Sequence, residues 1–188
     1  MNDIKIYSGT PPPPALFDSL FELIERSFPK CERRTKAEHL AEFEHPQFRS
    51  LCYCPDGKLA GFMNYWDMEG FVYLEHFAVA PELRGNGVGA ALAEELKNLS
   101  HGLIVLEAEP SEQSDTAKRR TGFYQRLGFY VNPYDYIQPP ISDNQPPVSL
   151  RLMTYPKVIP EDEYAKIRDA LYTHVYRVSC EWKRYLNE

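Results

Sequence analysis

The sequence predicts a mixed α/β fold, in which helices flank a mostly antiparallel, twisted sheet of about seven strands. Three observations support this prediction. Apolar strands joined by short turns cover residues 50–79, a glycine-rich turn then leads into a helix, and an unbroken apolar strand at 103–108 precedes a second helix. A chain of 188 residues is long enough for one domain with a sizeable core, and we expect a single domain over residues 1–188.

The N-terminal part predicts one strand and two helices. Ile4–Tyr7 is a short strand candidate, and apolar residues recur at helical spacing over residues 16–28. A second helix is expected over Thr35–Phe43, because Thr35 at its start and Glu38 three residues later form a capping-box pattern.

A meander of three antiparallel strands follows. Its predicted strands are Ser50–Cys54, Leu59–Trp66 and Phe71–Val79. The turns between them, at residues 55–58 and 67–70, contain the glycine and aspartate residues that tight turns favour. The third strand leads directly into the glycine-rich turn.

The glycine-rich turn is the most informative stretch of the chain. It reads Arg84-Gly85-Asn86-Gly87-Val88-Gly89 and opens a helix. A strand that runs through such a turn into a helix presents free backbone N–H groups at the helix N-terminus, where the partial positive charge suits a phosphate or pyrophosphate. The turn therefore predicts a phosphorylated cofactor.

Three strands and one helix complete the predicted fold. Leu103–Ala108 is almost continuously apolar, as in a strand that is covered on both faces. A basic helix is expected over Asp115–Leu127, ended by Gly128. Phe129–Ile137 and Val148–Tyr155 predict a last strand pair.

The C-terminal residues predict a long amphipathic helix over about Glu161–Tyr185. Its apolar and aromatic stripe consists of Tyr164, Ile167, Leu171, Val175, Val178, Trp182 and Tyr185. The simpler interpretation is that this stripe packs on the chain's own sheet. The alternative is a subunit interface in a homodimer.

Composition and charge exclude several classes of partner. The formal net charge is −6 and no basic block occurs, which argues against nucleic acid or an anionic membrane surface as the main partner. Neither a signal peptide nor an apolar segment of membrane-spanning length is evident, so we expect a cytoplasmic protein. The cysteines, at positions 31, 52, 54 and 180, lack zinc-site spacing, so we expect reduced structural thiols and no metal.

Two motifs together resemble the GNAT superfamily of N-acetyltransferases. Arg84, Gly87 and Gly89 fill the family pattern of Arg or Gln, two residues, Gly, one residue, and Gly or Ala. The segment Phe123-Tyr124-Gln125-Arg126-Leu127-Gly128-Phe129 resembles the family's "FYxxxGF" signature and follows in the family's order and spacing. The resemblance covers about residues 4–155, and the C-terminal helix, about residues 161–186, lies outside this common core.

The resemblance implies an enzyme that uses acetyl-CoA as co-substrate, bound where the fourth and fifth strands of the sheet splay apart. Backbone groups near the end of the fourth strand would pair with the pantetheine arm, and the N–H groups of the turn would hold the pyrophosphate. The residues expected to bind the cofactor are Phe77, Ala78, Val79, Arg84, Gly85, Asn86, Gly87, Val88, Gly89 and Ala90.

Acetyl transfer to an amine also needs a base, because an amine is mostly protonated at neutral pH. Glu75 is the first candidate, on the expectation that residues 73, 75, 77 and 79 share one strand face, and Glu107 is the second. His76 would then point to the other face and serve packing. Tyr124 resembles the family's general acid, which protonates the leaving CoA thiolate.

One position departs from the family. Many members carry an Asn seven residues before the tyrosine, where this chain has Ala117. The basic residues that follow, Lys118, Arg119 and Arg120, either contact phosphates of the nucleotide end or form a solvated helix face.

The resemblance also implies that the acceptor site is built from the first two helices and the loop between the last strands. Those segments hold aromatic and acidic side chains, which suit a cationic amine. They are Phe28, Glu32, Glu38, Phe43, Tyr134, Asp135, Tyr136 and Asp143. A primary amine of a small molecule is the first choice of acceptor, and a peptide N-terminus or protein lysine is the second. A non-catalytic regulator that binds acetyl-CoA is the alternative from another class.

Overall fold

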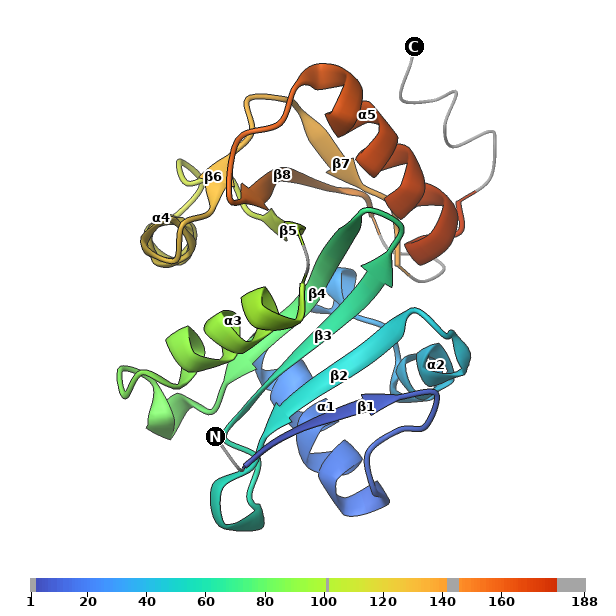
Figure 1. Ribbon diagram of the computed structural model, residues 1–188, viewed down its shortest axis with the longest axis vertical. Coiled ribbons are helices and arrows are strands. Elements are labelled where there is room, and N and C mark those ends of the chain that lie inside the picture. The colour runs from blue at the N-terminus through green and yellow to red at the C-terminus, as the bar shows by residue number, and fades with distance from the viewer. Residues whose placement is uncertain (1–2, 101, 142–145, 179–188) are drawn as a thin grey trace.

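The computed structural model describes residues 3–100, 102–141 and 146–178. Figure 1 shows its helices and strands, numbered in chain order. The strands are β1 (Ile4–Ser8), β2 (Phe48–Tyr53), β3 (Gly61–Met68), β4 (Phe71–Val79), β5 (Leu103–Ala108), β6 (Tyr130–Val131), β7 (Tyr136–Gln138) and β8 (Val148–Tyr155). The helices are α1 (Pro14–Ser27), α2 (Lys36–Ala41), α3 (Val88–Leu99), α4 (Asp115–Arg126) and α5 (Glu161–Ala170).

The sheet confirms the expected mixed, mostly antiparallel architecture. Its strand order in the described chain is β1-β2-β3-β4-β5-β8-β6, and β7 also pairs with β8. Among these pairs β4 and β5 run parallel, and the others are antiparallel. One face of the sheet packs on α3 and α4, whereas the other face packs on α1, α2 and α5. The face of α3 and α4 therefore buries one hydrophobic cluster, and the opposite face buries two.

The two parallel strands separate half-way along their length. Their register pairs Phe71–Leu74 with residues 103–106 and stops there, so the remainder of β4 has no partner on that side among the described strands. On its other edge β4 stays paired with β3 as far as Val79. The expected splay between the fourth and fifth strands is thus present.

A β-bulge lies where the splay begins. On β3, Asn64 pairs with His76 but the next residue, Tyr65, pairs with Leu74, which leaves Glu75 as an extra residue in β4. An extra residue shifts the alternation of side chains between the two faces.

The bulge corrects one expectation. Val72, Leu74, Phe77 and Val79 all pack in the cluster beneath α3 and α4, whereas Tyr73 belongs to the cluster on the opposite face. The prediction that residues 73, 75, 77 and 79 share one strand face is therefore wrong. Strict alternation holds only on either side of Glu75.

Local sequence signals predicted several elements correctly. Strands β4, β5 and β8 have the expected bounds. The capping box is also present, because the side chain of Thr35 accepts from the backbone N–H of Glu38 while the Glu38 carboxylate accepts from the backbone N–H of Thr35. The expected single strand over 129–137 is two short strands, because the side chain of Asn132 takes over bonds to Leu152 and Thr154 of β8.

The C-terminal helix is shorter than the sequence suggests. Helix α5 ends at Ala170 and continues as one π-helical turn, after which Arg177 adopts a positive φ of 53°. A residue in the left-handed region cannot continue a right-handed helix. Trp182 and Tyr185, the last two residues of the expected stripe, lie outside the described residues.

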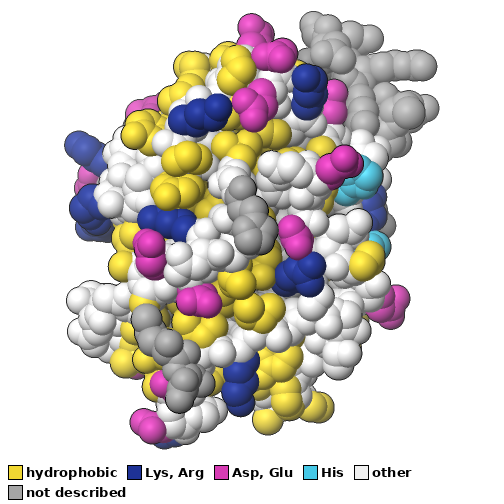
Figure 2. All heavy atoms as spheres, in the orientation of Figure 1, with side chains coloured by type: hydrophobic (Ala, Val, Ile, Leu, Met, Phe, Trp, Pro, Cys, Tyr) yellow, Lys and Arg dark blue, Asp and Glu magenta, His cyan; other side chains and the backbone are white. Residues whose placement is uncertain are grey.

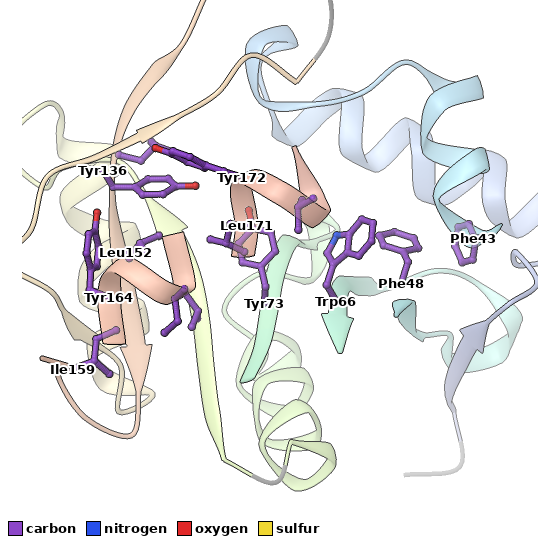
Figure 3. Packing of buried hydrophobic residues seen from close by; sticks show 14 of the residues in the cluster. Phe43, Phe48, Trp66, Tyr73, Tyr136, Leu152, Ile159, Tyr164, Leu171 and Tyr172 are labelled. Carbon is purple, nitrogen blue, oxygen red and sulfur yellow. The ribbon is translucent and has the colours of Figure 1, made fainter. Parts of the chain in front are cut away.

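The beginning of that stripe packs on the chain's own sheet. Tyr164, Ile167, Leu171 and Val175 are all buried in the cluster that also holds Trp66. Figure 3 shows Leu171 between Trp66 on one side and the tyrosines near β8 on the other. These four side chains confirm the simpler interpretation of the stripe.

The surface agrees with the charge of the sequence. In the space-filling view of Figure 2, acidic and basic side chains are scattered over the face shown, without a large patch of one sign. Among the helices that the structure describes, none combines the length and the apolar character needed to cross a membrane.

Candidate active site

The glycine turn places a helix N-terminus beside the open end of β4. Gly85 and Gly87 have positive φ values of 82° and 80°, a conformation that other residues adopt only at a cost. Gly87 is the N-cap of α3 and has no side chain to satisfy the first N–H groups of the helix. The turn is exposed from Arg84 to Gly87. Its free N–H groups are therefore accessible to an anion.

Two further residues shape this turn. The guanidinium Nε of Arg84 donates to the carbonyl oxygen of Val79 at 3.1 Å and so fastens the turn to the end of β4. A Cβ added at Gly89 would lie 3.2 Å from the rings of Phe77 and Phe123, a tight contact, so the absence of a side chain helps the helix to approach β4 closely. The two motifs of the sequence thus meet in space.

The open edge of β4 fits the other half of a CoA-type cofactor. Phe77, Ala78 and Val79 pair with β3 on one edge, and their other edge faces the splay. Backbone groups along such an edge can pair with the amides of an extended ligand. The cofactor-binding residues that the sequence suggests therefore form one continuous track from the splay to the helix.

A cavity lies in the splay, between the ends of β4 and β5. Residues from both strands line it, together with α1, α4 and the chain after α5. The residues with chemically reactive or aromatic side chains in its wall are Phe28, Glu32, Tyr73, Glu75, His76, Phe77, Glu107, Glu109, Arg120, Tyr124 and Tyr176. All three sequence-suggested catalytic residues, Glu75, Glu107 and Tyr124, are among them.

Tyr124 lies on the cofactor side of the cavity. Its ring contacts Phe77 of β4 and Phe129, with ring centres 6.4 and 5.9 Å apart. Burial raises the pKa of its phenol to about 12, against a smaller opposing effect of Arg120. The phenol is therefore protonated at neutral pH and can donate a proton.

Glu75 is held as an ion. One carboxylate oxygen forms an ion pair with Arg34, and the other accepts from the indole N–H of Trp66 at 2.9 Å. Burial would raise the pKa of Glu75, but the charge of Arg34, the neighbouring imidazole of His76 and these two hydrogen bonds lower it to about 2. Both oxygens of the first candidate base thus have strong partners.

Arg34 connects Glu75 to two distant parts of the chain. Its Nε lies 2.8 Å from a carboxylate oxygen of Glu42, and its Nη2 donates to the carbonyl oxygen of Val175 at 3.2 Å. Only 5% of the Arg34 side chain is exposed. This buried arginine is a feature that the sequence analysis missed, since nothing in a run of charged residues distinguishes it from its neighbours.

Glu107 has a different environment. Its Oε2 accepts from the hydroxyl of Tyr176 at 2.7 Å, and its buried Oε1 has no hydrogen-bond partner among the described residues. Burial raises the pKa of Glu107 to about 7, although the nearby hydroxyls of Tyr136, Tyr176 and Tyr73 lower it in part. This carboxyl group can therefore both take up and release a proton near neutral pH.

His76 serves packing, as expected, but it packs against Phe28 and His39 on the face of α1 and α2, so the expectation that it points away from the face of Tyr73 is wrong. Its Nε2 lies 3.1 Å from the carbonyl oxygen of Glu32, and its ring meets that of Phe28 edge-on, with centres 4.8 Å apart. Only 2% of its surface is exposed, and burial lowers its pKa. It is therefore neutral at physiological pH.

The basic residues of α4 have separate roles. Arg120 lines the cavity and pairs with Glu109 at 3.0 Å. Arg119 donates to the hydroxyl of Thr116 on its own helix at 3.3 Å. Arg120 is thus partly exposed and ion-paired at the cavity wall.

The residues expected to form the acceptor site divide into two groups. Phe28 and Glu32 line the cavity, and Tyr136 lies buried close to Glu107. Asp143 lies outside the described residues. Those with other contacts are Phe43, in the core, Glu38, in the capping box, Asp135, paired with Arg151, and Tyr134, in ring contact with Tyr164.

Comparisons with known proteins agree with this geometry. The sequence model of the Acetyltransferase (GNAT) family matches residues 17–129, which is more than half of the chain. The chain belongs to the GNAT acetyltransferase family. It is therefore an acyltransferase. The glycine turn lies within the matched region, and the motif at residues 123–129 ends at the last matched residue.

Individual relatives support the assignment. A solved structure, "Putative acetyltransferase from GNAT family from Bacteroides thetaiotaomicron", is 38% identical, with a TM-score of 0.78 and coverage of 87% of this chain and 93% of the other. The curated "Putative acetyltransferase YjbC" of Bacillus subtilis (strain 168) is 26% identical over 163 residues, 86% of this chain and 83% of that protein. The structure of Arabidopsis thaliana NAA60 in complex with acetyl-CoA has a TM-score of 0.60 at 17% identity, covering 81% and 96%, and so shares the fold.

The described residues contain no group of three or more His, Cys, Asp or Glu side chains arranged to hold a metal ion. Cys31, Cys52 and Cys54 are free thiols, and Cys180 lies outside the described residues.

Proposed function

We propose that this enzyme transfers the acetyl group of acetyl-CoA directly to a primary amine of a small molecule, with Glu107 as general base and Tyr124 as general acid. The observation that carries the proposal is the splay cavity. Its wall contains a carboxylate with an unpaired oxygen and a pKa of about 7, and a phenol that is protonated at the same pH.

Glu107 suits the role of base better than Glu75 for two reasons. A base works best when its pKa lies near the working pH, and the pKa of Glu75 is about 2. A base also needs an oxygen that can reach the amine, and both oxygens of Glu75 are hydrogen-bonded or ion-paired. We assign Glu75 instead to the ion pair that holds Arg34.

The proposed chemistry follows from these protonation states. Acetyl-CoA supplies an activated thioester that an uncharged amine can attack. The free Oε1 of Glu107 takes the proton that the ammonium group of the acceptor must lose first. As the C–N bond forms and the thioester C–S bond breaks, Tyr124 donates its phenolic proton to the departing CoA sulfur and regains one from the acylated nitrogen or solvent. In sum, the amine loses two protons, one of which ends on the CoA thiol and one in solvent.

The cofactor assignment rests on the track of backbone groups described above. The open edge of β4 over Phe77–Val79 matches the amides of a pantetheine arm, and the uncapped N-terminus of α3 over residues 84–90 matches a pyrophosphate. The exposed turn leaves room for that group, because a Cβ added at Gly85 or Gly87 would meet no atom within 4 Å.

The choice of a cationic amine rests on the charges in the cavity wall. Glu109 is neutralised by Arg120, whereas Glu32 and Glu107 have no ion-pair partner among the described residues. Burial raises the pKa of Glu32, and the charge of Glu109 adds to this effect against that of Arg120. A bound ammonium group would relieve this excess of negative charge, and Phe28 offers it an aromatic face.

A peptide N-terminus or a protein lysine is the second candidate acceptor. We favour a small molecule because the cavity wall includes side chains that are almost fully buried, among them Tyr73 and His76 of β4. A non-catalytic regulator that binds acetyl-CoA would need neither a base nor an acid. We favour an enzyme because Glu107 and Tyr124 line the same cavity.

The test combines a turnover assay with a binding assay. Release of free CoA from acetyl-CoA is measured with polyamines, amino acids, aminoglycosides and short peptides, and acetyl-CoA binding is measured separately by calorimetry. Acceptor-dependent release that E107Q abolishes, while E75Q retains measurable turnover, supports the proposal. Binding without release across the panel favours the regulator, and absence of binding refutes the cofactor assignment.

A further inference from the structure

We propose that the C-terminal turn, residues 171–178, completes the active site, and that its Tyr176 is a positioning residue that holds the carboxylate of Glu107. The inference rests on the function proposed above for Glu107. Residues 171–178 lie beyond the region that the family model matches.

An irregular backbone brings Tyr176 to the site. The π-helical turn Leu171–Val175 inserts an extra residue into the helix, and the backbone N–H of Tyr176 bonds to the carbonyl oxygen of Leu171, five residues earlier. Arg177 then leaves the helical conformation with its positive φ of 53°. Both π-helical turns and residues in the left-handed region cost backbone energy and are frequent at functional sites.

Three consecutive residues of the C-terminal turn hold it against the site. The carbonyl oxygen of Val175 accepts from Arg34, the arginine that pairs with Glu75. Arg177 pairs with Glu42 through two hydrogen bonds of 2.5 and 3.2 Å. Between them, the hydroxyl of Tyr176 reaches Glu107. The turn is therefore fixed on both sides of the residue that contacts the base.

The hydrogen bonds around Tyr176 have a definite direction. Tyr176 donates its single hydroxyl proton to Oε2 of Glu107 at 2.7 Å, so the hydroxyl of Tyr73, 3.0 Å away, must donate to Tyr176. This chain of two hydroxyls fixes Oε2 and leaves Oε1 as the oxygen without a partner in the described chain. The arrangement orients Oε1 for the acceptor amine.

Several titratable groups face Glu107 from the surrounding elements. They are Tyr73 and Glu75 of β4, Tyr136 of β7 and Tyr176 of the C-terminal turn, with Tyr164 of α5 and Tyr172 near enough for Glu107 to affect their charge. Glu75 raises the pKa of Glu107, and the three hydroxyls of Tyr136, Tyr176 and Tyr73 lower it. Because the bond from Tyr176 stabilises the carboxylate, its loss raises this pKa.

The experiment compares two tyrosines of the same turn. Tyr176→Phe removes the bond to Glu107. Tyr172→Phe is the matched control, because its hydroxyl donates instead to the carbonyl oxygen of Ile137 at 2.5 Å and forms no hydrogen bond to Glu107. The pKa of Glu107 is followed by carboxyl NMR in glutamate-labelled protein, with its signal assigned by E107Q. This measurement needs no acceptor.

We expect Tyr176→Phe to raise the pKa of Glu107 by about one unit, and Tyr172→Phe to leave it within a few tenths. With an active acceptor, the ascending limb of the pH profile of kcat/KM shifts by the same amount in Tyr176→Phe. If Tyr176→Phe does not fold, Tyr73→Phe replaces it, with an upward shift of smaller size.

Two results would overturn the inference. One is an unchanged pKa of Glu107 in Tyr176→Phe or its substitute, and the other is an equal shift in Tyr172→Phe. Failure of the proposed function itself gives a distinct result, because E107Q would then retain wild-type turnover whatever the tyrosine variants do to the pKa.

Discussion

We expect replacement of Glu75 and of Glu107 by glutamine to change the free energy of unfolding in opposite directions. The two carboxyl groups line one cavity, yet their pKa values differ by several units, about 2 against about 7. Glu75 is stabilised as an ion by Arg34, whereas Glu107 is buried without a cationic partner in the described chain. Neutral glutamine therefore removes a favourable charge at one position and an unfavourable charge at the other.

The magnitude at Glu75 follows from its pKa. The value falls from 4.5 in the unfolded chain to about 2, and each pKa unit corresponds to about 1.36 kcal/mol, so the ionised group contributes about 3 kcal/mol. Breaking one side of a buried ion pair costs a similar amount, about 3–5 kcal/mol. This contribution is fully present above pH 4.5 and is lost as the pH falls towards 2.

The magnitude at Glu107 has the opposite sign. Its pKa rises from 4.5 to about 7 on folding, so the unfolded chain releases its proton first as the pH increases. Stability therefore decreases between pH 4.5 and pH 7 and remains about 3 kcal/mol lower above that range. Glutamine at this position has no charge, so E107Q does not lose this stability at high pH.

Urea unfolding at two pH values tests both statements. At pH 8 we expect E75Q to lose about 3 kcal/mol and E107Q to gain up to about 3 kcal/mol. At pH 5 the loss in E75Q persists, while the gain in E107Q shrinks below about 1 kcal/mol. Destabilisation of E107Q at pH 8 by as much as E75Q would refute the reasoning, because it would mean that a partner holds Glu107 as an ion.

Three further predictions concern the proposed chemistry. Tyr124→Phe should lower kcat by about 10²-fold or more without weakening acetyl-CoA binding, as measured by turnover and by calorimetry. An equal loss of binding would assign the phenol to the cofactor site instead. Gly87→Ala should weaken acetyl-CoA binding by about 1–2 kcal/mol, because a methyl group strains the positive φ of the turn although it meets no neighbouring atom. Unchanged affinity would place the pyrophosphate elsewhere. The pH profile of kcat/KM should rise with an apparent pKa near 7, as set by Glu107, and a profile that is flat between pH 5 and pH 8 would exclude this base.

The sequence could predict the elements whose signals are local. The glycine turn, the capping box of Thr35 and the bounds of β4, β5 and β8 all follow from residues that lie next to one another in the chain. Turn glycines, caps and apolar runs act over a few residues, so their effect can be read without knowledge of the fold.

The bulge at Glu75 shows where local patterns stop being sufficient. A strand with one extra residue has the same composition as a regular strand, so alternation places Glu75 and Phe77 on one face. The pairing of β4 with β3 instead puts Phe77 on the face of Val72 and Leu74. Whether a bulge forms depends on the partner strand.

The predicted length of the C-terminal helix was wrong for a related reason. A stripe at three- and four-residue spacing continues past Val175, but the chain leaves the helix at Arg177, which pairs with Glu42 of the loop after α2. Tyr176 is not one of the stripe residues, so the sequence pattern did not single it out. Its partner Glu107 lies 69 residues away.

By itself the sequence determined the family, and it suggested the cofactor track and the two carboxylates that compete as base, because motifs and strand ends record local backbone geometry. Only the tertiary structure decided between the roles of those carboxylates. Arg34 and Trp66 hold Glu75 as an ion, whereas tyrosines from β4, β7 and the C-terminal turn surround Glu107 without a compensating charge. A pKa depends on burial and on groups that the fold brings from far along the chain, and neither is written in the neighbouring residues.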